Sequence, residues 1–168
     1  MAYTLIGFMG VGKTSIGKAL AELLDVPFID TDIEIEKMTG STIPDIFNEY
    51  GEAYFRALEY EVLKKYINMN IILSTGGGIV ENPNNILLLK KNKMNIWVDT
   101  NINTVYNRIV NDINRPNAKN KSFDSIKNLY FERRSRYNEI AYISVVNNNE
   151  LSSCVQEIYN FIIADEGN

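Results

Sequence analysis

The segment "GFMGVGKT", from Gly7 to Thr14, holds residues whose types and spacing bind phosphate, because it matches the pattern G-x-x-x-x-G-K-[ST]. A strand pattern precedes it and an amphipathic helix pattern follows it. The glycines let successive backbone N–H groups converge on phosphate oxygens, and the positive end of the helix reinforces this attraction. Lys13 would reach the β- and γ-phosphates, and the Thr14 hydroxyl would ligate Mg²⁺. The motif predicts that a nucleoside triphosphate binds, but it identifies no reaction.

Two carboxylates in "FIDTD", Asp30 and Asp32, end the next predicted strand. In open α/β sheets, ligands bind at the carboxyl ends of the strands. On an extended segment the two side chains point the same way, so one could hold a magnesium-bound water while the other binds a substrate hydroxyl. Because the sequence contains no histidine, Asp32 is the best candidate to orient that hydroxyl and receive its proton. The alternative is that both aspartates only cap the following helix.

Arginines on two predicted helices could bind an anionic substrate. "GEAYFRALE" supplies Arg56, and Glu59 lies three residues later, where the two side chains could pair. "FERRSRY" supplies Arg133, Arg134 and Arg136. Most surface arginines are solvated charges covering apolar surface, and at least one of this second group is expected to be of that kind. One arginine from each helix, converging on one pocket, would instead bind a carboxylate bidentately.

Three consecutive glycines, Gly76, Gly77 and Gly78, follow the apolar strand pattern "NIILS". Glycine loses more backbone entropy on folding than any other residue. A run of three therefore indicates an unusual conformation or a group that comes very close to the backbone. The glycines by themselves do not identify that group.

The elements that must position these residues are short apolar runs alternating with longer helical patterns. The predicted strands are 3–8, 28–30, 71–74, 95–99 and 142–146. Between them, apolar residues recur at helical spacing, and Thr42, Pro44 and Asp45 mark the start of one helix. This alternation predicts an α/β fold with a parallel sheet that helices cover on both faces.

The segment "NRPNAKNKSFDS", residues 114–125, interrupts the alternation because it is polar and offers little to bury. A segment of this kind is usually a surface loop. It is also where a mobile lid over an active site would lie.

The bulk properties limit the class of protein. With 168 residues the chain fits one domain, and its net charge of −4 argues against a nucleic-acid-binding surface. The single cysteine, Cys154, cannot form an internal disulfide, which favours a reducing compartment. The amino-terminal residues are a poor signal peptide, and no apolar stretch approaches the roughly 20 residues that span a bilayer. We therefore expect a cytoplasmic protein that binds no membrane.

Together these blocks resemble the shikimate kinase family over nearly the full length of the chain. The resemblance is carried by "GFMGVGKT", "FIDTD", "IPDIFNEYGEAYFRALE", "STGGGI", "NRP" and the R-x-x-x-Y spacing of Arg133 and Tyr137. It implies a P-loop fold of the nucleoside-monophosphate-kinase type, with three α/β/α layers and a five-stranded parallel sheet. The implied parts of this single domain, 1–168, are a phosphate loop at 7–14, a substrate-binding helical segment at about 31–60, and a lid at about 113–125.

The resemblance also implies roles for individual residues. Asp32 matches the aspartate that binds the shikimate hydroxyls, and Asp30 its companion near Mg²⁺, which it would reach through water beside Thr14. Arg56 and Arg133 match the arginines that clamp the shikimate carboxylate. Gly78 matches a glycine whose backbone touches the substrate, and we expect Gly76 and Gly77 to belong to the same surface. The expected ATP-binding residues are Gly10, Val11, Gly12, Lys13, Thr14, Ser15, Arg108 and Arg115.

The implied reaction is ATP-dependent phosphorylation of the 3-hydroxyl of shikimate, with Asp32, Lys13 and Arg115 as catalytic residues and Mg²⁺ as cofactor. Arg115 matches the lid arginine that closes over the transferred phosphate, and Arg108 a position against the adenine. We expect a monomer whose ligands are shikimate and ATP. Two features depart from the family pattern: the lid continues as "NAKNKS" where leucines are usual, and the loop at 147–149 lacks an expected proline.

Two other functions remain open at this point. One is a kinase of the same fold that acts on gluconate or a nucleoside monophosphate, since function is determined by the site and not by the fold. The other is a nucleotide-binding module without turnover. Loss of Lys13, Asp32 or Arg115 would indicate such a module, but all three are present.

Overall fold

A parallel sheet forms the centre of the molecule, and its strands run in the order β2-β3-β1-β4-β5. The computed structural model describes residues 1–111, 121–148 and 150–166. Within these residues the strands are β1 (Tyr3–Ile6), β2 (Phe28–Asp30), β3 (Ile72–Ser74), β4 (Asn95–Asp99) and β5 (Ile143–Val146). Every pairing between neighbours is parallel. The predicted five-stranded parallel sheet is confirmed, and β2 and β4 match their predicted bounds.

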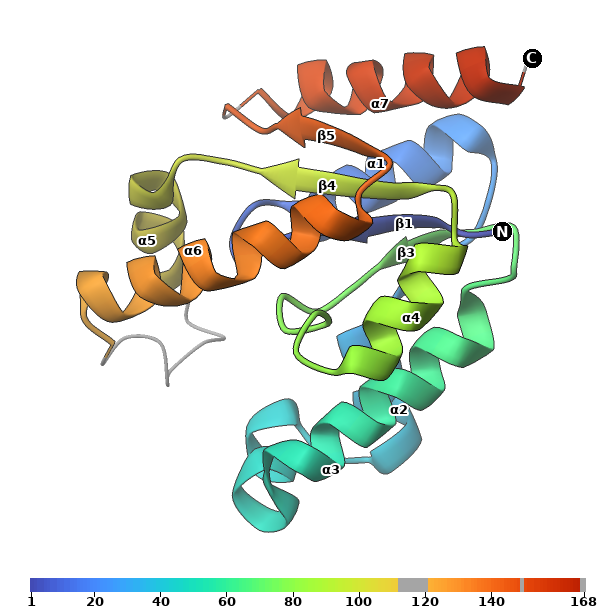
Figure 1. The fold of residues 1–168 in the computed structure, drawn as a ribbon. Helices are drawn as coiled ribbons and strands as arrows, with labels where there is room; N and C mark the ends of the chain where they lie inside the picture. Colours follow the sequence, from blue (N-terminus) through green and yellow to red (C-terminus); the bar gives the residue numbers. More distant parts are fainter. Residues whose placement is uncertain (112–120, 149, 167–168) are drawn as a thin grey trace.

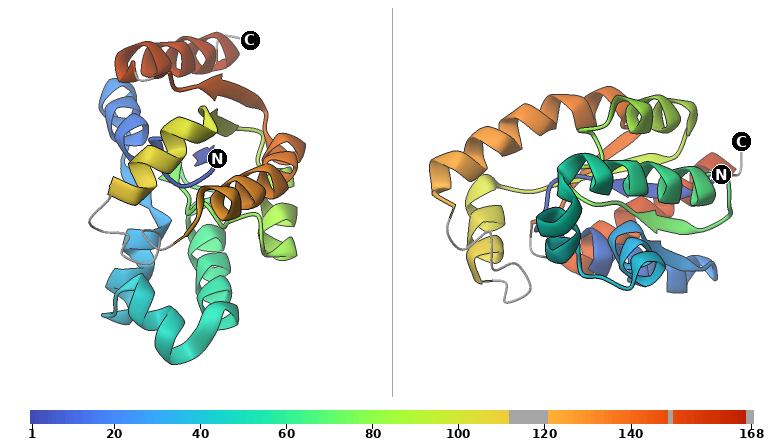
Figure 2. Two further views of the ribbon diagram at one scale, coloured as in Figure 1. Left: turned by 90° about the vertical axis from the view of Figure 1, so that its left-hand side faces the viewer. Right: turned by 90° about the horizontal axis from the view of Figure 1, so that it is seen from below.

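Helices cover both faces of this sheet (Figure 1). They are α1 (Lys13–Leu24), α2 (Thr31–Thr39), α3 (Ile43–Tyr66), α4 (Pro83–Lys91), α5 (Ile102–Asn111), α6 (Phe123–Ile140) and α7 (Leu151–Glu166). The end-on view in Figure 2 shows α1 and α7 on one side of the strands and α4 and α6 on the other. The three-layer arrangement predicted from the strand–helix alternation is therefore confirmed. No helix among the described residues is both long enough and apolar enough to cross a bilayer.

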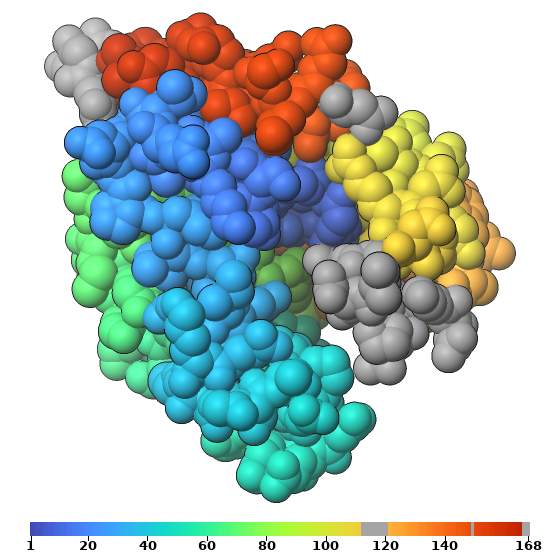
Figure 3. Space-filling view, turned by 180° about the vertical axis from the view of Figure 1, so that it is seen from behind, coloured from blue at the N-terminus to red at the C-terminus, as the bar shows by residue number. Residues whose placement is uncertain are grey.

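Two separate hydrophobic clusters hold the fold together. The larger one joins the sheet to α1, α6 and α7 through fully buried side chains such as Leu5, Ile16 and Ile158. The smaller one, formed by Ile35, Ile46, Phe55 and Val62, lies between α2 and α3. These two helices therefore have a core of their own, and they form an arm beside which the molecular surface is hollowed (Figure 3). Burial of apolar area between α2 and α3 stabilises this arm, and Leu63 of α3 also joins it to the larger cluster.

The start of α3 follows from local sequence. The Thr42 side chain accepts a hydrogen bond from the backbone N–H of Asp45, and Pro44 occupies the first turn, where it disrupts no intrahelical bond. Both features confirm the predicted helix start. Gly51, with φ 82° and ψ 173°, kinks the helix in its middle. Only glycine adopts this backbone conformation readily, so the kink is encoded at that position.

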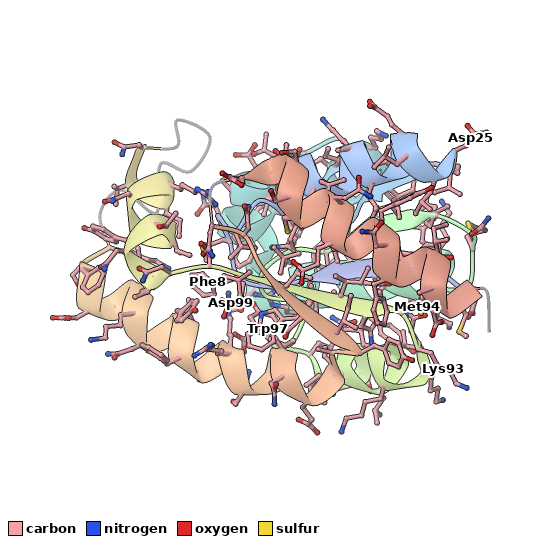
Figure 4. All side chains as sticks on the ribbon, turned by 90° about the horizontal axis from the view of Figure 1, so that it is seen from above. Phe8, Asp25, Lys93, Met94, Trp97 and Asp99 are labelled. Atoms are coloured by element: carbon pink, nitrogen blue, oxygen red, sulfur yellow. The ribbon has the colours of Figure 1, made fainter. Side chains whose placement is uncertain are left out.

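The sheet order brings the predicted functional segments together. The phosphate loop follows β1, the aspartates follow β2 and the glycines follow β3, and these are three adjacent strands. All of them leave the sheet at its carboxyl edge. Figure 4 shows this edge at Phe8 and Asp99, with Lys93, Met94 and Asp25 at the opposite end of the molecule. The parallel topology thus gathers residues that are tens of positions apart in the chain.

Two expectations from the sequence need correction. The polar segment predicted as loop to residue 125 ends earlier, because α6 begins at Phe123 with Ser122 as its cap. The Ser122 side chain accepts a hydrogen bond from the N–H of Ser125, which is the reason the helix starts there. Asp30 and Asp32 also do not share an extended segment: Asp30 caps α2, and Asp32 lies in the first turn of that helix.

Candidate active site

The phosphate loop joins β1 to α1 in the conformation that its glycines allow. Gly10 and Gly12 have φ values of 81° and 101°, which strain residues with side chains. Lys13 opens α1 and is almost buried, and its ammonium donates hydrogen bonds to the carbonyls of Gly7 at 2.7 Å and Phe8 at 2.8 Å. The cation is therefore held across the loop, within reach of phosphates bound by the loop.

Two side chains from distant segments brace the phosphate loop. Arg108, on α5, donates a hydrogen bond to the Gly10 carbonyl at 2.9 Å, which places it beside the loop. Asn147, after β5, donates to the Val11 carbonyl at 2.8 Å and is buried. A Cβ atom on Gly12 would lie 2.7 Å from the Asn147 amide nitrogen, so glycine at this position also makes room for the brace. The sequence offered no signal for this role of Asn147.

Thr14 and Asp30 lie together at the entrance of α1. The Thr14 hydroxyl donates to Asp30 Oδ2 at 3.0 Å, while Oδ1 of the same carboxylate accepts the Asp32 N–H and caps α2. Asp30 therefore caps α2, as the alternative interpretation expected, and its other oxygen contacts Thr14; its role at the metal stays a prediction. A hydroxyl and a carboxylate are hard oxygen donors of the kind that Mg²⁺ prefers. Mg²⁺ is commonly held by one or two such groups together with water and phosphate oxygens, so this pair fits the ion.

A cavity of about 910 Å³ connects the phosphate loop to Asp32. Its size is that of a small-molecule site. The lining residues that the sequence had predicted are Gly10, Gly12, Lys13, Thr14, Ser15, Asp30, Asp32, Gly76, Gly77 and Arg108. Val11 is buried beneath the loop. Lys121, at the start of the described part after residue 120, also lines the cavity. Arg115 lies outside the described residues.

Each glycine of the run makes room for a different part of the site. A Cβ atom on Gly76 would lie 2.7 Å from Asp32 Oδ1, and one on Gly77 would lie 2.8 Å from the Met9 backbone nitrogen. A Cβ atom on Gly78 would overlap the guanidinium of Arg56. The Gly76 N–H also donates to the buried Thr31 hydroxyl at 3.1 Å. The groups that come close to this backbone are therefore the protein's own acid, its phosphate loop and its arginine.

Substitution of Gly78 by alanine tests this arrangement. The added methyl group would meet the end of a flexible side chain, so Arg56 will move while the backbone stays in place. We expect the KM for the anionic substrate to rise about ten- to hundred-fold, because a displaced binding group loses its alignment. Gly77→Ala is the comparison. Its methyl group would meet the backbone of the phosphate loop, so this variant should also raise the KM for ATP. Steady-state kinetics with each substrate varied will separate the two, and an unchanged KM in Gly78→Ala would contradict the arrangement.

Arg56 and Glu59 form the ion pair that their spacing predicted. Arg56 Nη1 lies 3.0 Å from Glu59 Oε2, and Nη2 lies 3.1 Å from Glu52 Oε1. The Glu59 side chain is 0% exposed and also lies near Asp32, since both carboxylates lie close to the position that a Cβ atom on Gly76 would occupy. Burial raises the pKa of Glu59 to about 7, and Arg56 offsets only part of that effect. The sequence predicted the pair, but not that Glu59 belongs to the site.

This raised pKa makes stability depend on pH in a defined direction. In the folded protein Glu59 holds its proton up to a pKa of about 7, against an ordinary value of 4.5, so stability falls as pH rises between these values. Replacing Glu59 by glutamine removes this titration. The free energy of unfolding of the wild type, minus that of Glu59→Gln, should therefore decrease by about 2–3 kcal/mol between pH 5 and pH 8. Urea unfolding at several pH values measures it, and a difference that stays constant would refute the assignment.

Arg133 extends from α6 toward the same region. Its side chain is 9% exposed, Nε lies 2.5 Å from Glu81 Oε1, and the guanidinium carbon lies 5.7 Å from the centroid of the Phe8 ring. One turn later, the buried Tyr137 hydroxyl donates to the Gly77 carbonyl, which accounts for the R-x-x-x-Y spacing. Arg133 and Asp32 both influence the pKa of Glu59, so the charged groups share one electrostatic environment.

The structure separates the remaining arginines of α6. Arg134 is 48% exposed and pairs with Asp99 at 3.2 Å, which confirms that one of this group lies at the surface. Arg136 pairs with Glu81 at 2.7 Å. Arg56, Gly78 and Arg133 are not part of the described lining of the cavity, but Arg133 lies over the ring of Phe8, which does line it, and Arg56 lies against Gly78. The sequence did not indicate Glu81, because no local pattern marks a carboxylate that pairs across 52 residues.

Comparisons with known proteins show the family to which the chain is similar. The sequence model of the family described as "Shikimate kinase" matches residues 9–163. A shikimate kinase of Macrococcus caseolyticus is 73% identical over 168 residues, which are 100% of both chains. The crystal structure of the Aquifex aeolicus enzyme has a TM-score of 0.86 at 36% identity, covering 99% of this chain and 98% of that one.

A second solved structure, a shikimate kinase from Acinetobacter baumannii in complex with shikimate, has a TM-score of 0.88 at 33% identity. It covers 98% of this chain and 93% of that chain. Agreement in sequence and in fold thus extends over the whole length. The chain belongs to the shikimate kinase family.

Proposed function

We propose that this protein transfers the γ-phosphoryl group of ATP to the 3-hydroxyl of shikimate, giving ADP and shikimate 3-phosphate, a step toward chorismate and the aromatic amino acids. The observation that carries the proposal is the cavity that joins the phosphate loop to Asp32, with two arginines beside it. Full-length similarity to shikimate kinases, one of them solved with shikimate, supports it. Shikimate has hydroxyls for the aspartate and a carboxylate for the arginines.

Asp32 orients the acceptor hydroxyl and receives its proton. It lies in the first turn of α2, and its Oδ1 approaches Gly76 closely, so the carboxylate faces the glycine backbone. Arg56 from α3 and Arg133 from α6 bind the substrate carboxylate, one from each side of the glycine segment. The guanidinium fork suits this bidentate contact. The backbone of Gly76 and Gly77 lines the cavity and contacts the ring, and Gly78 contributes by leaving room for the Arg56 guanidinium.

Lys13 stabilises charge on the transferred phosphoryl oxygens, and Arg115 carries the same role from the predicted lid before α6. A loose phosphoryl transition state leaves the protein mainly positioning and charge neutralisation to perform. Val11 and the neighbouring backbone N–H groups of the loop bind the phosphates, with Ser15 beside them and Arg108 toward the nucleotide. Closure of the lid excludes water, which would otherwise compete as acceptor.

Thr14 would hold Mg²⁺ through its hydroxyl, and Asp30 would hold it through a water molecule. When bound, the ion would supply positive charge that stabilises the phosphate oxygens. The Thr14–Asp30 contact of 3.0 Å supports this assignment. We further propose that the protein acts as a monomer in the cytoplasm, where its one cysteine, the buried Cys154, stays reduced.

A coupled assay of ADP release tests the proposed function. Purified protein with ATP and Mg²⁺ is offered shikimate, quinate, gluconate or a nucleoside monophosphate, and a reaction without acceptor is the control. We expect rapid turnover with shikimate alone, and loss of it when EDTA removes the metal. Faster turnover with gluconate or a nucleotide would favour the other kinases, whereas ATP binding without ADP release would favour a non-catalytic module.

A further inference from the structure

Glu81 lies three residues after Gly78, the last of the three glycines, and binds two arginines of α6. Its N–H donates to the Gly78 carbonyl at 2.9 Å, so a tight turn joins it to the last glycine. One carboxylate oxygen accepts from Arg133 Nε at 2.5 Å, and the other accepts from Arg136 Nη1 at 2.7 Å. Both oxygens of a single carboxylate are therefore used to fix two guanidinium groups.

The same turn also touches the other arginine that we assign to the substrate carboxylate. The Asn82 amide donates to the backbone carbonyl of Arg56 at 3.3 Å, and Gly78 lies against the Arg56 guanidinium. Asn82 in turn caps α4, which anchors the turn to the body of the protein. Residues 78–82, here called the clamp turn, thus contact both α3 and α6. The turn therefore fixes the position of Arg56 relative to that of Arg133.

The geometry of the Arg133–Glu81 contact determines how Arg133 can act. Glu81 binds Nε, and the two terminal nitrogens lie at the far end of the planar guanidinium. A planar group held at Nε and lying over the Phe8 ring has few orientations open to it. The terminal nitrogens are therefore directed as a pair, which is the arrangement that a carboxylate accepts bidentately.

The charges of this group favour an anionic ligand. Burial opposes ionisation of Glu81, but its bonds to Arg133 and Arg136 outweigh burial and lower the pKa of its carboxyl. Glu81 is thus ionised at neutral pH. Two guanidinium groups share this one carboxylate, and Arg136 also contacts the exposed Glu132 at 3.4 Å, so the buried positive charge of the group lies at Arg133. Glu81 can hold Arg133 in place without cancelling the attraction for a substrate carboxylate.

We propose that Glu81 is a positioning residue for substrate binding: through Nε it orients Arg133 so that the terminal nitrogens face the substrate carboxylate. This inference rests on the proposed function, because it takes shikimate as the carboxylate-bearing substrate. Glu81 acts through Arg133 and has no part in phosphoryl transfer.

The test compares Glu81→Gln with Glu139→Gln. Glu139 is the matched control, because it also forms an ion pair, with Lys90, that joins α6 to the region of α4, but at the surface. In Glu81→Gln we expect the KM for shikimate to rise about ten-fold, while kcat and the KM for ATP change less than about two-fold. Glu139→Gln should match the wild type. Glu81→Asp, which keeps the charge, should show a smaller rise, and it provides the measurement should Glu81→Gln fail to fold.

A double-mutant cycle with Arg133→Ala shows whether Glu81 acts through that residue. In the Arg133→Ala background, Glu81→Gln should raise the KM by less than about two-fold, because the group it positions is gone. Glu81→Gln should likewise change the KM for a shikimate methyl ester only slightly, because the ester lacks the carboxylate that Arg133 binds. The proposal would be overturned if Glu81→Gln left the KM for shikimate unchanged or lowered it, or if it reduced kcat as much as it raised the KM. Additive effects of Glu81→Gln and Arg133→Ala on the KM would also overturn it. Wild-type turnover with shikimate tests the proposed function separately.

Discussion

Lys13→Ala will lower kcat for phosphorylation of shikimate by roughly 10²–10³-fold, which is the usual effect of removing one fixed group that stabilises transition-state charge. The ammonium of Lys13 is already held over the phosphate loop, bonded to the carbonyls of Gly7 and Phe8. It therefore needs little reorganisation to reach the phosphates. The loss should appear in kcat, since charge on the transferred oxygens is largest in the transition state.

The control for this variant is Lys18→Ala. Lys18 lies on the same helix, α1, but is exposed, so its removal should change kcat less than about two-fold. Steady-state kinetics should be combined with thermal unfolding of both variants, because Lys13 also bonds the loop itself. A folded Lys13→Ala protein that loses less than ten-fold in kcat would contradict the role of Lys13 in phosphoryl transfer.

Removal of either arginine assigned to the substrate carboxylate should mainly weaken binding. For Arg133→Ala and for Arg56→Ala we expect a loss of about 2–5 kcal/mol in shikimate binding, as found when one partner of a buried charge pair is truncated. The side chain of Arg133 is 9% exposed and that of Arg56 is 15% exposed. Because both lie in places that water hardly reaches, water cannot take over the hydrogen bonds of a removed guanidinium group. Removal of Arg56 also leaves the buried Glu59 without its guanidinium partner, and removal of Arg133 leaves Glu81 with Arg136 alone, which adds to the cost.

Arg134→Ala provides the matched control for Arg133→Ala, because it removes the same side chain at the next position of α6. Arg134 is 48% exposed and contacts Asp99 and the Trp97 ring, away from the glycine segment. Its removal should leave the KM for shikimate within about two-fold of the wild type. Titration calorimetry with shikimate gives the affinities directly. Losses confined to kcat, with binding unchanged in both site variants, would disprove the carboxylate clamp.

Much of the fold could be predicted from the sequence because it depends on local patterns. The runs at 28–30 and 95–99 became β2 and β4 with the predicted bounds, since short apolar segments between turn residues have few alternatives. Thr42 and Pro44 marked the start of α3 because capping and proline act within one helical turn. The phosphate loop was evident for the same reason: its function depends on consecutive backbone groups.

Other predictions failed or stayed incomplete where the local pattern was ambiguous. The segment 114–125 looks like loop throughout, but Ser122 starts α6, because one capping side chain outweighs a polar composition. Asp30 and Asp32 look like a pair on a strand, whereas the chain turns into α2 between them. A single residue decides each of these helix boundaries. A periodicity pattern is read over a longer window of residues, so it does not register the effect of one capping residue.

The sequence by itself determined the strand–helix order, the phosphate loop and the types of residue that could bind an acceptor. The tertiary structure decided which of them meet. Adjacency of β2, β3 and β1 brings Asp32, Gly76 and the loop to one edge, and pairings such as Glu81 with Arg133 or Asn147 with Val11 join segments 52 and 136 residues apart. Such contacts depend on how the whole chain packs, and no local propensity encodes them. The roles of Glu59, Glu81 and Asn147 could therefore be recognised only once the sheet order and helix packing were known.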